Sequence, residues 1–143
     1  MIDREARDVA VTALRDFMEG AISNREYERK YPTSERDPAL WAIYSQIWFH
    51  YSDISEHTLT GKHQLNVDGQ RLLERCLLFL RSDLEYLWPP QKLRLWHGIL
   101  RLLGLGRIMK RGKTDEATLY DAGVWPFFDT AQRNQTASLA HER

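Results

Sequence analysis

Hydrophobic residues recur at helical intervals from the first residues of the chain onward. In segment 2–19 they stand at Ile2, Ala6, Val9, Ala10, Ala13, Leu14, Phe17 and Met18. That spacing gathers them on one face of a helix and leaves the charged residues mainly on the other. Gly20, a common helix terminator, follows directly. The pattern therefore predicts a first helix over residues 2–19.

Two local signals predict where the next helices begin. Ser23 and Glu26 are spaced as a capping box, in which each side chain pairs with a free backbone amide at the helix start. We expect a short helix there, stopped by Pro32. Asp37-Pro38 is the second signal, because Asp is a favoured N-cap and Pro suits the first helical position.

A long third helix is predicted over residues 38–59. Its apolar face consists of Leu40, Ile43, Tyr44, Ile47, Tyr51 and Ile54. We expect most of this face to be buried, including both tyrosines. Trp41 and Trp48 are seven residues apart at the edge of the same face, and we expect this pair to protrude. Tryptophan is enriched in the hot spots of protein interfaces, so both are candidate partner-binding residues.

The second half of the chain contains two further helical patterns. Residues 62–70 are turn-like, with Asp68-Gly69 as a break, and a leucine-rich fourth helix is expected over 72–83. A fifth helix is expected over 90–103, and a short one over 115–120. Cys76 lies on the apolar face of the fourth helix, where a cysteine usually behaves as a small, inert hydrophobe.

Together these patterns predict a mainly α single domain, a bundle of five or six helices over residues 1–128. The chain has 19 leucines, whereas valine and isoleucine together number 11, and this balance favours helices over a β-sandwich. A small two-stranded β pairing between Glu85–Trp88 and Val124–Phe127 remains an alternative for those segments. Residues 129–143 are polar and are expected to form a frayed C-terminal tail.

The charges are balanced overall but segregated along the chain. There are 20 basic and 20 acidic residues, for a formal net charge of zero. Segment 91–113 nevertheless carries seven bases and no acid, with Arg94 and Arg101 seven apart on its outer side. This pattern is typical of a core helix with a solvated basic face. The same face, through Arg94 and Arg101, is a candidate contact for an acidic protein partner. A nucleic-acid partner is less expected, since the remaining excess of acids repels phosphates.

His50, Asp53 and His57 are three and four residues apart, so on a helix they share one flank. Imidazole and carboxylate groups at this spacing can bind zinc or iron, which gives an alternative function as a metal-dependent helical hydrolase. The pattern is not an HExxH motif, and no second ligand pair accompanies it. A polar helix flank is the favoured interpretation, and we expect neither a metal nor another cofactor.

Other features indicate a cytoplasmic protein. The longest apolar run is Cys76–Leu80, much shorter than a membrane span. The first residues, MIDREARD, contain acids where a signal peptide has a basic and then an apolar stretch, so no export signal is expected. A single cysteine fits a reducing compartment.

Two motifs resemble a set of small bacterial proteins of uncharacterised function. They are YSD at 51–53, after the tryptophan-bearing helix, and FLRSDLEY at 79–86, followed by WP at 88–89. The resemblance covers about residues 20–90 and assigns no catalytic residue. It implies, by association, an immunity-like or accessory protein. The function expected is therefore a non-catalytic cytoplasmic module that binds a protein, with an oligomeric state that the sequence does not indicate.

Overall fold

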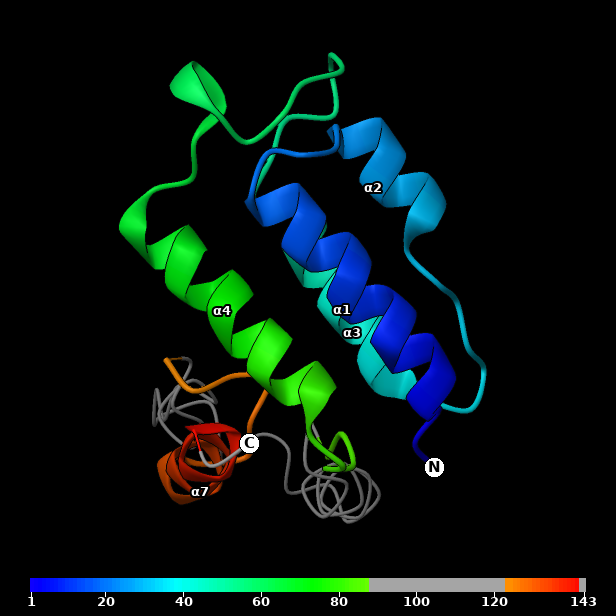
Figure 1. Ribbon diagram of the computed structural model, residues 1–143, viewed down its shortest axis with the longest axis vertical. Helices are drawn as coiled ribbons and strands as arrows, with labels where there is room; N and C mark the ends of the chain where they lie inside the picture. Colours follow the sequence, from blue (N-terminus) through cyan, green and yellow to red (C-terminus); the bar gives the residue numbers. More distant parts are fainter. Residues whose placement is uncertain (88–122, 142–143) are drawn as a thin grey trace, which may run out of the picture.

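The computed structural model describes residues 1–87 and 123–141. Its helices, with the short 3₁₀ helix η1, are packed as shown in Figure 1. Their bounds are α1 Arg4–Met18, α2 Asn24–Lys30, α3 Pro38–Trp48, η1 Gly61–His63, α4 Val67–Arg81 and α7 Thr130–His141. The mainly α bundle predicted from the sequence is thus confirmed, and the described residues contain no strand.

α1 is the central element of the bundle. In Figure 1 it runs between α2 and α4, with α3 behind it. Its inward face buries Ala10, Leu14 and Phe17, while Glu5, Asp8 and Arg15 stay on the outside. The helical period read from the sequence therefore corresponds to a buried face, and Gly20 ends the segment with a positive φ of 72°.

Both cap signals are confirmed. Ser23 accepts a hydrogen bond from the amide of Glu26, and the Glu26 carboxylate accepts one from the amide of Ser23, which completes the capping box of α2. Asp37 caps α3 by accepting from the amide of Ala39, and Pro38 is the first helical residue. These starts depend on residues within one turn of each other, so they are readable locally.

The expected extension of the third helix to Leu59 is wrong, because α3 ends at Trp48. The chain that follows is held instead by Asn24, which is fully buried at the start of α2. Its amide nitrogen donates to the carbonyls of Ser52 and Ser55, both at 3.2 Å, and its amide oxygen accepts from the backbone of His57 at 3.0 Å. The backbone groups of the chain after α3 therefore pair with the Asn24 side chain on α2, and not with one another within a helix.

The fourth helix starts earlier than expected. Asp68 and Gly69, expected to form a turn, lie in the first turn of α4. The Asn66 side chain accepts from the amide of Gly69 at 2.8 Å and so caps the helix. Towards its other end α4 buries Cys76, Phe79 and Leu80, as its apolar face predicted.

The C-terminal segment also differs from the expectation. Residues Thr130–His141 form helix α7, although a frayed tail was expected over 129–143. The carboxylate of Asp129 accepts from the amide of Gln132 at 2.8 Å, which satisfies one of the free amides at the helix start. α7 packs against α4, and this tertiary contact supports a helix with little amphipathic character of its own.

The two segments proposed to form a β pairing lie close together but do not pair as strands in the residues that the structure describes. No strand is present in the described parts, residues 85–87 and 124–127. Instead, the indole nitrogen of Trp125 donates to the hydroxyl of Tyr86 at 3.2 Å. The β alternative is therefore wrong for these residues. Trp88 and the predicted helices 90–103 and 115–120 lie outside the described residues.

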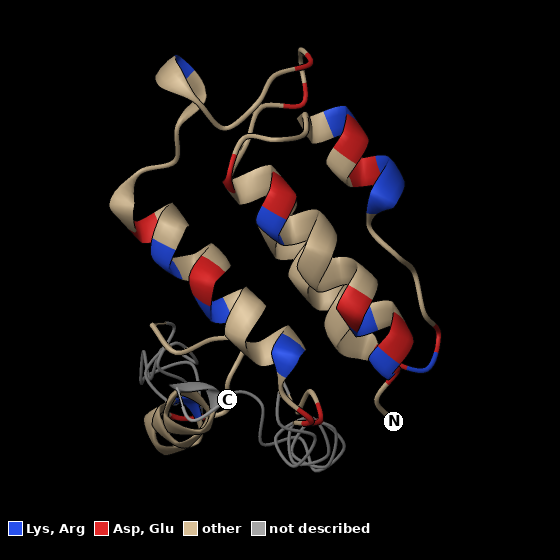
Figure 2. Cartoon of the chain, in the orientation of Figure 1, with Lys and Arg blue, Asp and Glu red and all other residues tan. Residues whose placement is uncertain are grey.

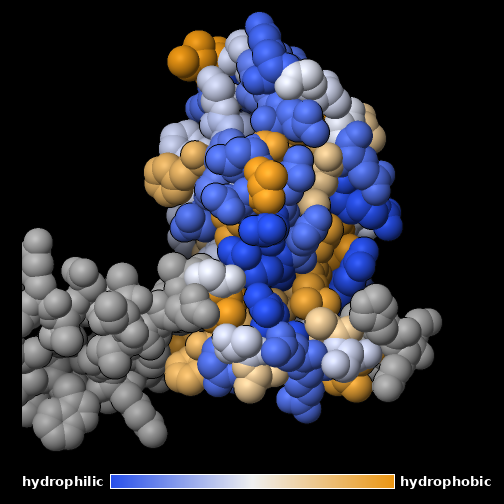
Figure 3. Space-filling view, turned by 90° about the vertical axis from the view of Figure 1, so that its left-hand side faces the viewer, coloured by the Kyte–Doolittle hydropathy of each residue, from blue (hydrophilic) through white to orange (hydrophobic). Residues whose placement is uncertain are grey.

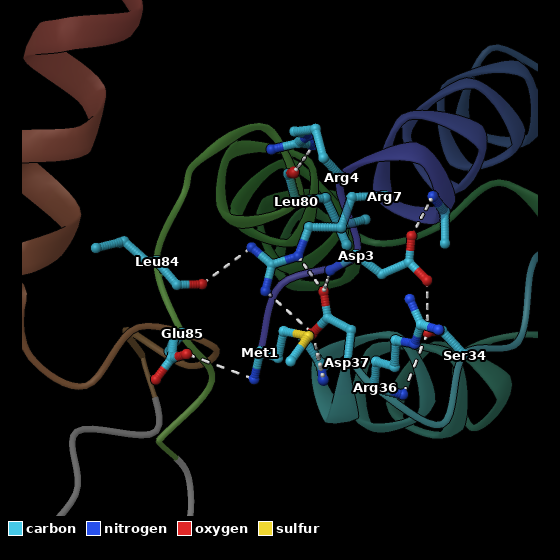
Figure 4. Close-up of polar contacts among 12 residues, drawn as sticks. Met1, Asp3, Arg4, Arg7, Ser34, Arg36, Asp37, Leu80, Leu84 and Glu85 are labelled. Atoms are coloured by element: carbon cyan, nitrogen blue, oxygen red, sulfur yellow. Dashed lines mark hydrogen bonds and ion pairs between the residues drawn. The ribbon is translucent and has the colours of Figure 1, made fainter.

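A buried ion pair fastens α1 to the rest of the fold (Figure 4). The guanidinium of Arg7 donates from Nε to Asp37 Oδ2 at 2.6 Å and from Nη2 to Oδ1 at 3.1 Å. Its Nη1 donates to the backbone carbonyls of Ser82 and Leu84, at 2.9 and 3.0 Å. Arg7 thus joins α1, the start of α3 and the chain after α4 at one point.

Candidate functional site

The outer side of α3 carries large exposed aromatic side chains. Trp41 is 69% exposed, Trp48 40% and Phe49, which follows the helix, 75%. We call these three residues the aromatic face of α3. The exposure of Trp41 and Trp48 confirms that this pair protrudes. The rings of Trp48 and Phe49 meet edge to face, 5.6 Å apart, so they form one continuous apolar patch.

The sequence of α3 explains why aromatic rings remain in water there. The helix has only two polar residues, Ser45 and Gln46, and Figure 2 shows no charge on it, whereas α2 is densely charged. Ile43 and Ile47 are buried against the core. A helix that is apolar nearly all round is normally covered on every side. Here the side of α3 that faces away from the core is not covered.

A cleft of about 460 Å³ lies beside Trp41, between the end of α2 and the start of α3. Its walls include Glu28, Tyr31, Glu35, Leu40, Trp41 and Tyr44. The rings of Trp41 and Tyr44 are nearly parallel, 6.1 Å apart, so they line one wall together. Tyr44, expected to be buried, is only half-buried for this reason. The Glu28 carboxylate is held by Arg25 at 3.2 Å, and Glu35 is exposed at the rim.

A second cleft, of about 550 Å³, separates α4 from α7 and is lined in part by Leu78, Leu84 and Leu139. Figure 3 views the molecule from the side of α4. Most of the upper part of that face is hydrophilic, and hydrophobic residues gather in its lower part. The aromatic face of α3 is therefore not the one apolar feature on the described surface, but it contains the largest exposed rings.

The residues of the metal alternative do not form a ligand set. Because α3 ends early, His50, Asp53 and His57 lie in the chain that follows it and share no helix flank. The Asp53 carboxylate instead pairs with the guanidinium of Arg25 at 2.7 Å. Among the described side chains, no group of three or more His, Cys, Asp or Glu is placed to hold a metal ion. The geometry thus corrects the expectation of a shared flank on which the hydrolase alternative depended.

The histidine side chains meet other groups instead. The ring of His57 stacks on that of His63, with centroids 4.0 Å apart and planes 24° apart. His50 lines the same polar pocket as these two rings. From the sequence, His63 lies just beyond the predicted helix, so its stacking on His57 was not expected. Sequence reasoning also missed Asn24, which positions His57; no local pattern marks Asn24 as different from a surface residue.

Cys76 is not placed to act as a nucleophile in this fold. It is buried among the apolar residues of α4, and burial raises the pKa of its thiol far above the usual range. A thiol in that state carries almost no thiolate at neutral pH. The structure thus agrees with the inert role expected from the sequence.

The remaining candidate residues, Arg94 and Arg101, and the whole basic segment 91–113 lie outside the described residues. Their expected contact with an acidic partner stays a prediction. Comparisons with protein-family models, with curated proteins and with solved structures found no match. None of the described helices is long and apolar enough to span a membrane.

Proposed function

We propose that the chain is a non-catalytic protein-binding module that contacts its partner through the aromatic face of α3. The observation that carries this proposal is the exposure of Trp41 and Trp48 on a helix without a charged residue, with Phe49 exposed directly after it. Tryptophan dominates the binding energy of many protein interfaces, because one rigid side chain buries a large area with little loss of conformational entropy.

The surroundings of Trp41 favour a partner that places a basic side chain beside an apolar one. The exposed carboxylate of Glu35 borders the cleft, and its aromatic wall attracts a cation. The rings of Trp41 and Tyr44 are too close, at 6.1 Å, to enclose a cation between them. A planar guanidinium stacked over the outer ring face fits this arrangement better than a bulky quaternary ammonium group.

The resemblance of the YSD and FLRSDLEY motifs adds a direction for the search. It favours an immunity-like or accessory protein, which acts by covering a surface of its partner and not by chemistry of its own. In that form of the proposal, the partner is encoded close to this chain and loses its activity in the complex. Arg94 and Arg101 offer a separate contact for an acidic region of the same partner.

The proposal is tested by affinity capture with the full chain as bait. The variants are Trp41→Ala/Trp48→Ala and, as a control, Phe128→Ala, because Phe128 is an exposed aromatic residue outside α3. We expect wild type and the control to retain the same partner from lysate of the source cells. With that partner purified, we expect the double variant to bind it about thirtyfold more weakly or worse, as removal of a hot spot does.

The opposite pattern contradicts the proposal. If a purified partner binds the double variant as tightly as wild type, the aromatic face of α3 is not the contact. Circular dichroism of the variants accompanies the measurement, so that a loss of binding is not mistaken for a loss of fold. Trp41 and Trp48 are exposed, and their removal should leave the helical signal unchanged.

A further inference from the structure

A polar pocket of about 430 Å³ lies at the end of the bundle where the chain after α3 passes η1, at the top of Figure 1. We call it the histidine pocket. Its polar lining residues include His50, Ser52, His57, Lys62, His63 and Asn66. No Asp or Glu is among its lining residues. Phe49 and Leu65 add apolar surface, and every polar group of the lining is neutral or basic, in a protein with equal numbers of acidic and basic residues.

The acidic residues next in the chain are engaged elsewhere. The Asp53 carboxylate pairs with Arg25 on α2 at 2.7 Å. The Glu56 carboxylate accepts from the hydroxyl of Ser23 at 2.6 Å. Both carboxylates are therefore held on the α2 side, which leaves the positive groups of the histidine pocket without a local counter-charge.

The tautomer of His57 follows from its hydrogen bond. Its Nδ1 lies 2.8 Å from the carbonyl oxygen of Ser55, and because a carbonyl only accepts, Nδ1 carries the proton. Nε2 is then an acceptor in the neutral ring and becomes a donor only when the ring is protonated. The hydrogen-bonding character of His57 at this nitrogen therefore reverses on protonation.

His63 faces two positive neighbours. Its ring stacks on His57, and Lys62 is the preceding residue. Desolvation first, and then the positive charges of His57 and Lys62, lower the pKa of His63. Tyr51 borders the pocket as a neutral ring. Two imidazolium rings 4.0 Å apart repel each other unless an anion lies against both.

We propose that the histidine pocket binds a phosphate dianion, with protonated His57 and His63 and the Lys62 ammonium donating to its oxygens. A phosphate presents three or more acceptor oxygens, which matches several donors around one pocket better than a carboxylate does. The hydroxyl of Ser52 and the amide of Asn66 supply neutral donors in the same lining. The binding takes up protons, so it tightens as the pH falls toward the range in which imidazole is charged.

This site adjoins the aromatic face of α3, because Phe49 also lines the histidine pocket. The inference does not rest on the function proposed for that face. The phosphate belongs either to a free ion or to a small monoester. The arms of the experiment separate these sources, because inorganic phosphate and O-phosphoserine are titrated in parallel. Failure of one proposal leaves the other unaffected.

The test follows the histidine side-chain signals of the full chain by NMR, at constant ionic strength set with chloride. We expect inorganic phosphate or O-phosphoserine to shift the His57 and His63 signals saturably and to raise the pKa of His63 by about one. Sulfate stays a dianion over this pH range. Any change in its affinity with pH therefore reports protonation of the protein and not of the ligand. We expect sulfate to bind several-fold more weakly at about pH 8 than at about pH 6.5.

Two variants and a control make the outcome decisive. His63→Gln and Lys62→Gln should each abolish saturable binding, and Lys62 is exposed, so its variant is expected to fold. Lys30→Gln, which removes an equal charge at the end of α2 away from the pocket, should bind like wild type. Shifts that do not saturate, or that are the same in Lys62→Gln and Lys30→Gln, overturn the proposal.

Discussion

The guanidinium group of Arg7 uses all three of its nitrogens inside the protein. Two of them hold the Asp37 carboxylate, and the third donates to two carbonyls after α4. The group also lies 5.2 Å from the centre of the Phe79 ring. A buried charge is tolerated only when its hydrogen bonds are satisfied and an opposite charge lies against it. Both conditions are met at Arg7.

Arg7→Met tests this arrangement at the residue scale. The variant keeps most of the side-chain volume but leaves the Asp37 carboxylate buried without its partner. We expect the free energy of unfolding, measured by urea titration near neutral pH, to fall by about 3–5 kcal/mol.

Arg25→Met is the matched control. Its ion pair with Asp53 is about half exposed, so removing it should lower the free energy of unfolding by about 1 kcal/mol or less. An equal loss of unfolding free energy in the two variants would show that the burial of the Arg7 ion pair does not increase its contribution to stability.

At the scale of elements, the sequence predicted the starts of α2 and α3 correctly but not the end of α3. The capping box at Ser23 and the Asp37-Pro38 start act within one turn, so the sequence displays them. The non-helical path of the chain after α3 depends on Asn24, whose partners lie 28 to 33 residues away. Apolar spacing continued past Trp48 and predicted more helix, because periodicity carries no information about a competing tertiary hydrogen bond.

The distinction between local and long-range contacts also explains how much of the candidate sites could be predicted. Trp41 and Trp48 lie on one helix, so their shared exposure followed from their spacing. The histidine pocket combines the chain after α3 with η1, and the fold of that chain depends on Asn24. Its members His57 and His63 therefore could not be paired from the sequence.

Gly20 provides a test at the junction of α1 and α2. Its φ is +72°, and a Cβ there would lie 2.6 Å from Thr60 Cγ2. Gly61 also has a positive φ, +56°, but a Cβ there would meet nothing within 4 Å. We expect Gly61→Ala to lower the free energy of unfolding by about 1 kcal/mol, from backbone strain alone. Gly20→Ala should lower it more, because a steric clash is added.

A Thr60→Ser background removes the clashing methyl group. In that background the two glycine substitutions should have similar effects on the urea midpoint. If Gly20→Ala stays more damaging there, the contact with Thr60 is not the cause of the difference.

At the scale of the whole molecule, the core contains a cluster of tyrosine rings around Tyr27. Tyr27 stacks on Phe17 at 4.7 Å and meets the rings of Tyr31 and Tyr51 edge to face. Within the described structure, the hydroxyls of Tyr27 and Tyr31 are buried without a hydrogen-bond partner. Burial raises the pKa of both groups well above that of a free tyrosine.

The raised values predict an alkaline limit to stability. Below about pH 10 these tyrosines are neutral in both folded and unfolded chains, so they add no pH dependence. Above it the unfolded chain ionises and the folded one does not, so stability falls as the pH rises. We expect a loss of about 1.4 kcal/mol per pH unit from each buried tyrosine, measured by urea titration from about pH 8 to 11.

Tyr27→Phe should reduce that alkaline slope. It should also leave stability near neutral pH unchanged or higher, because it removes a buried hydroxyl without a partner. Phe128 is exposed, so Phe128→Tyr adds a tyrosine that ionises alike in both states and should leave the slope as in wild type. A slope that is unaffected by Tyr27→Phe would assign the alkaline loss to other groups.

The partners of Arg7 also set the order in which the molecule opens and assembles. Asp37 is 30 residues away along the chain, and the carbonyls of Ser82 and Leu84 are 75 and 77 residues away. The full set of bonds forms only once three distant stretches have met, so its completion belongs to the late part of folding. Conversely, α1 cannot detach without leaving the buried Asp37 carboxylate, at the start of α3, without its ion-pair partner. The backbone amides of α1, the start of α3 and residues 82–84 should therefore exchange their hydrogens together, as one cooperative unit.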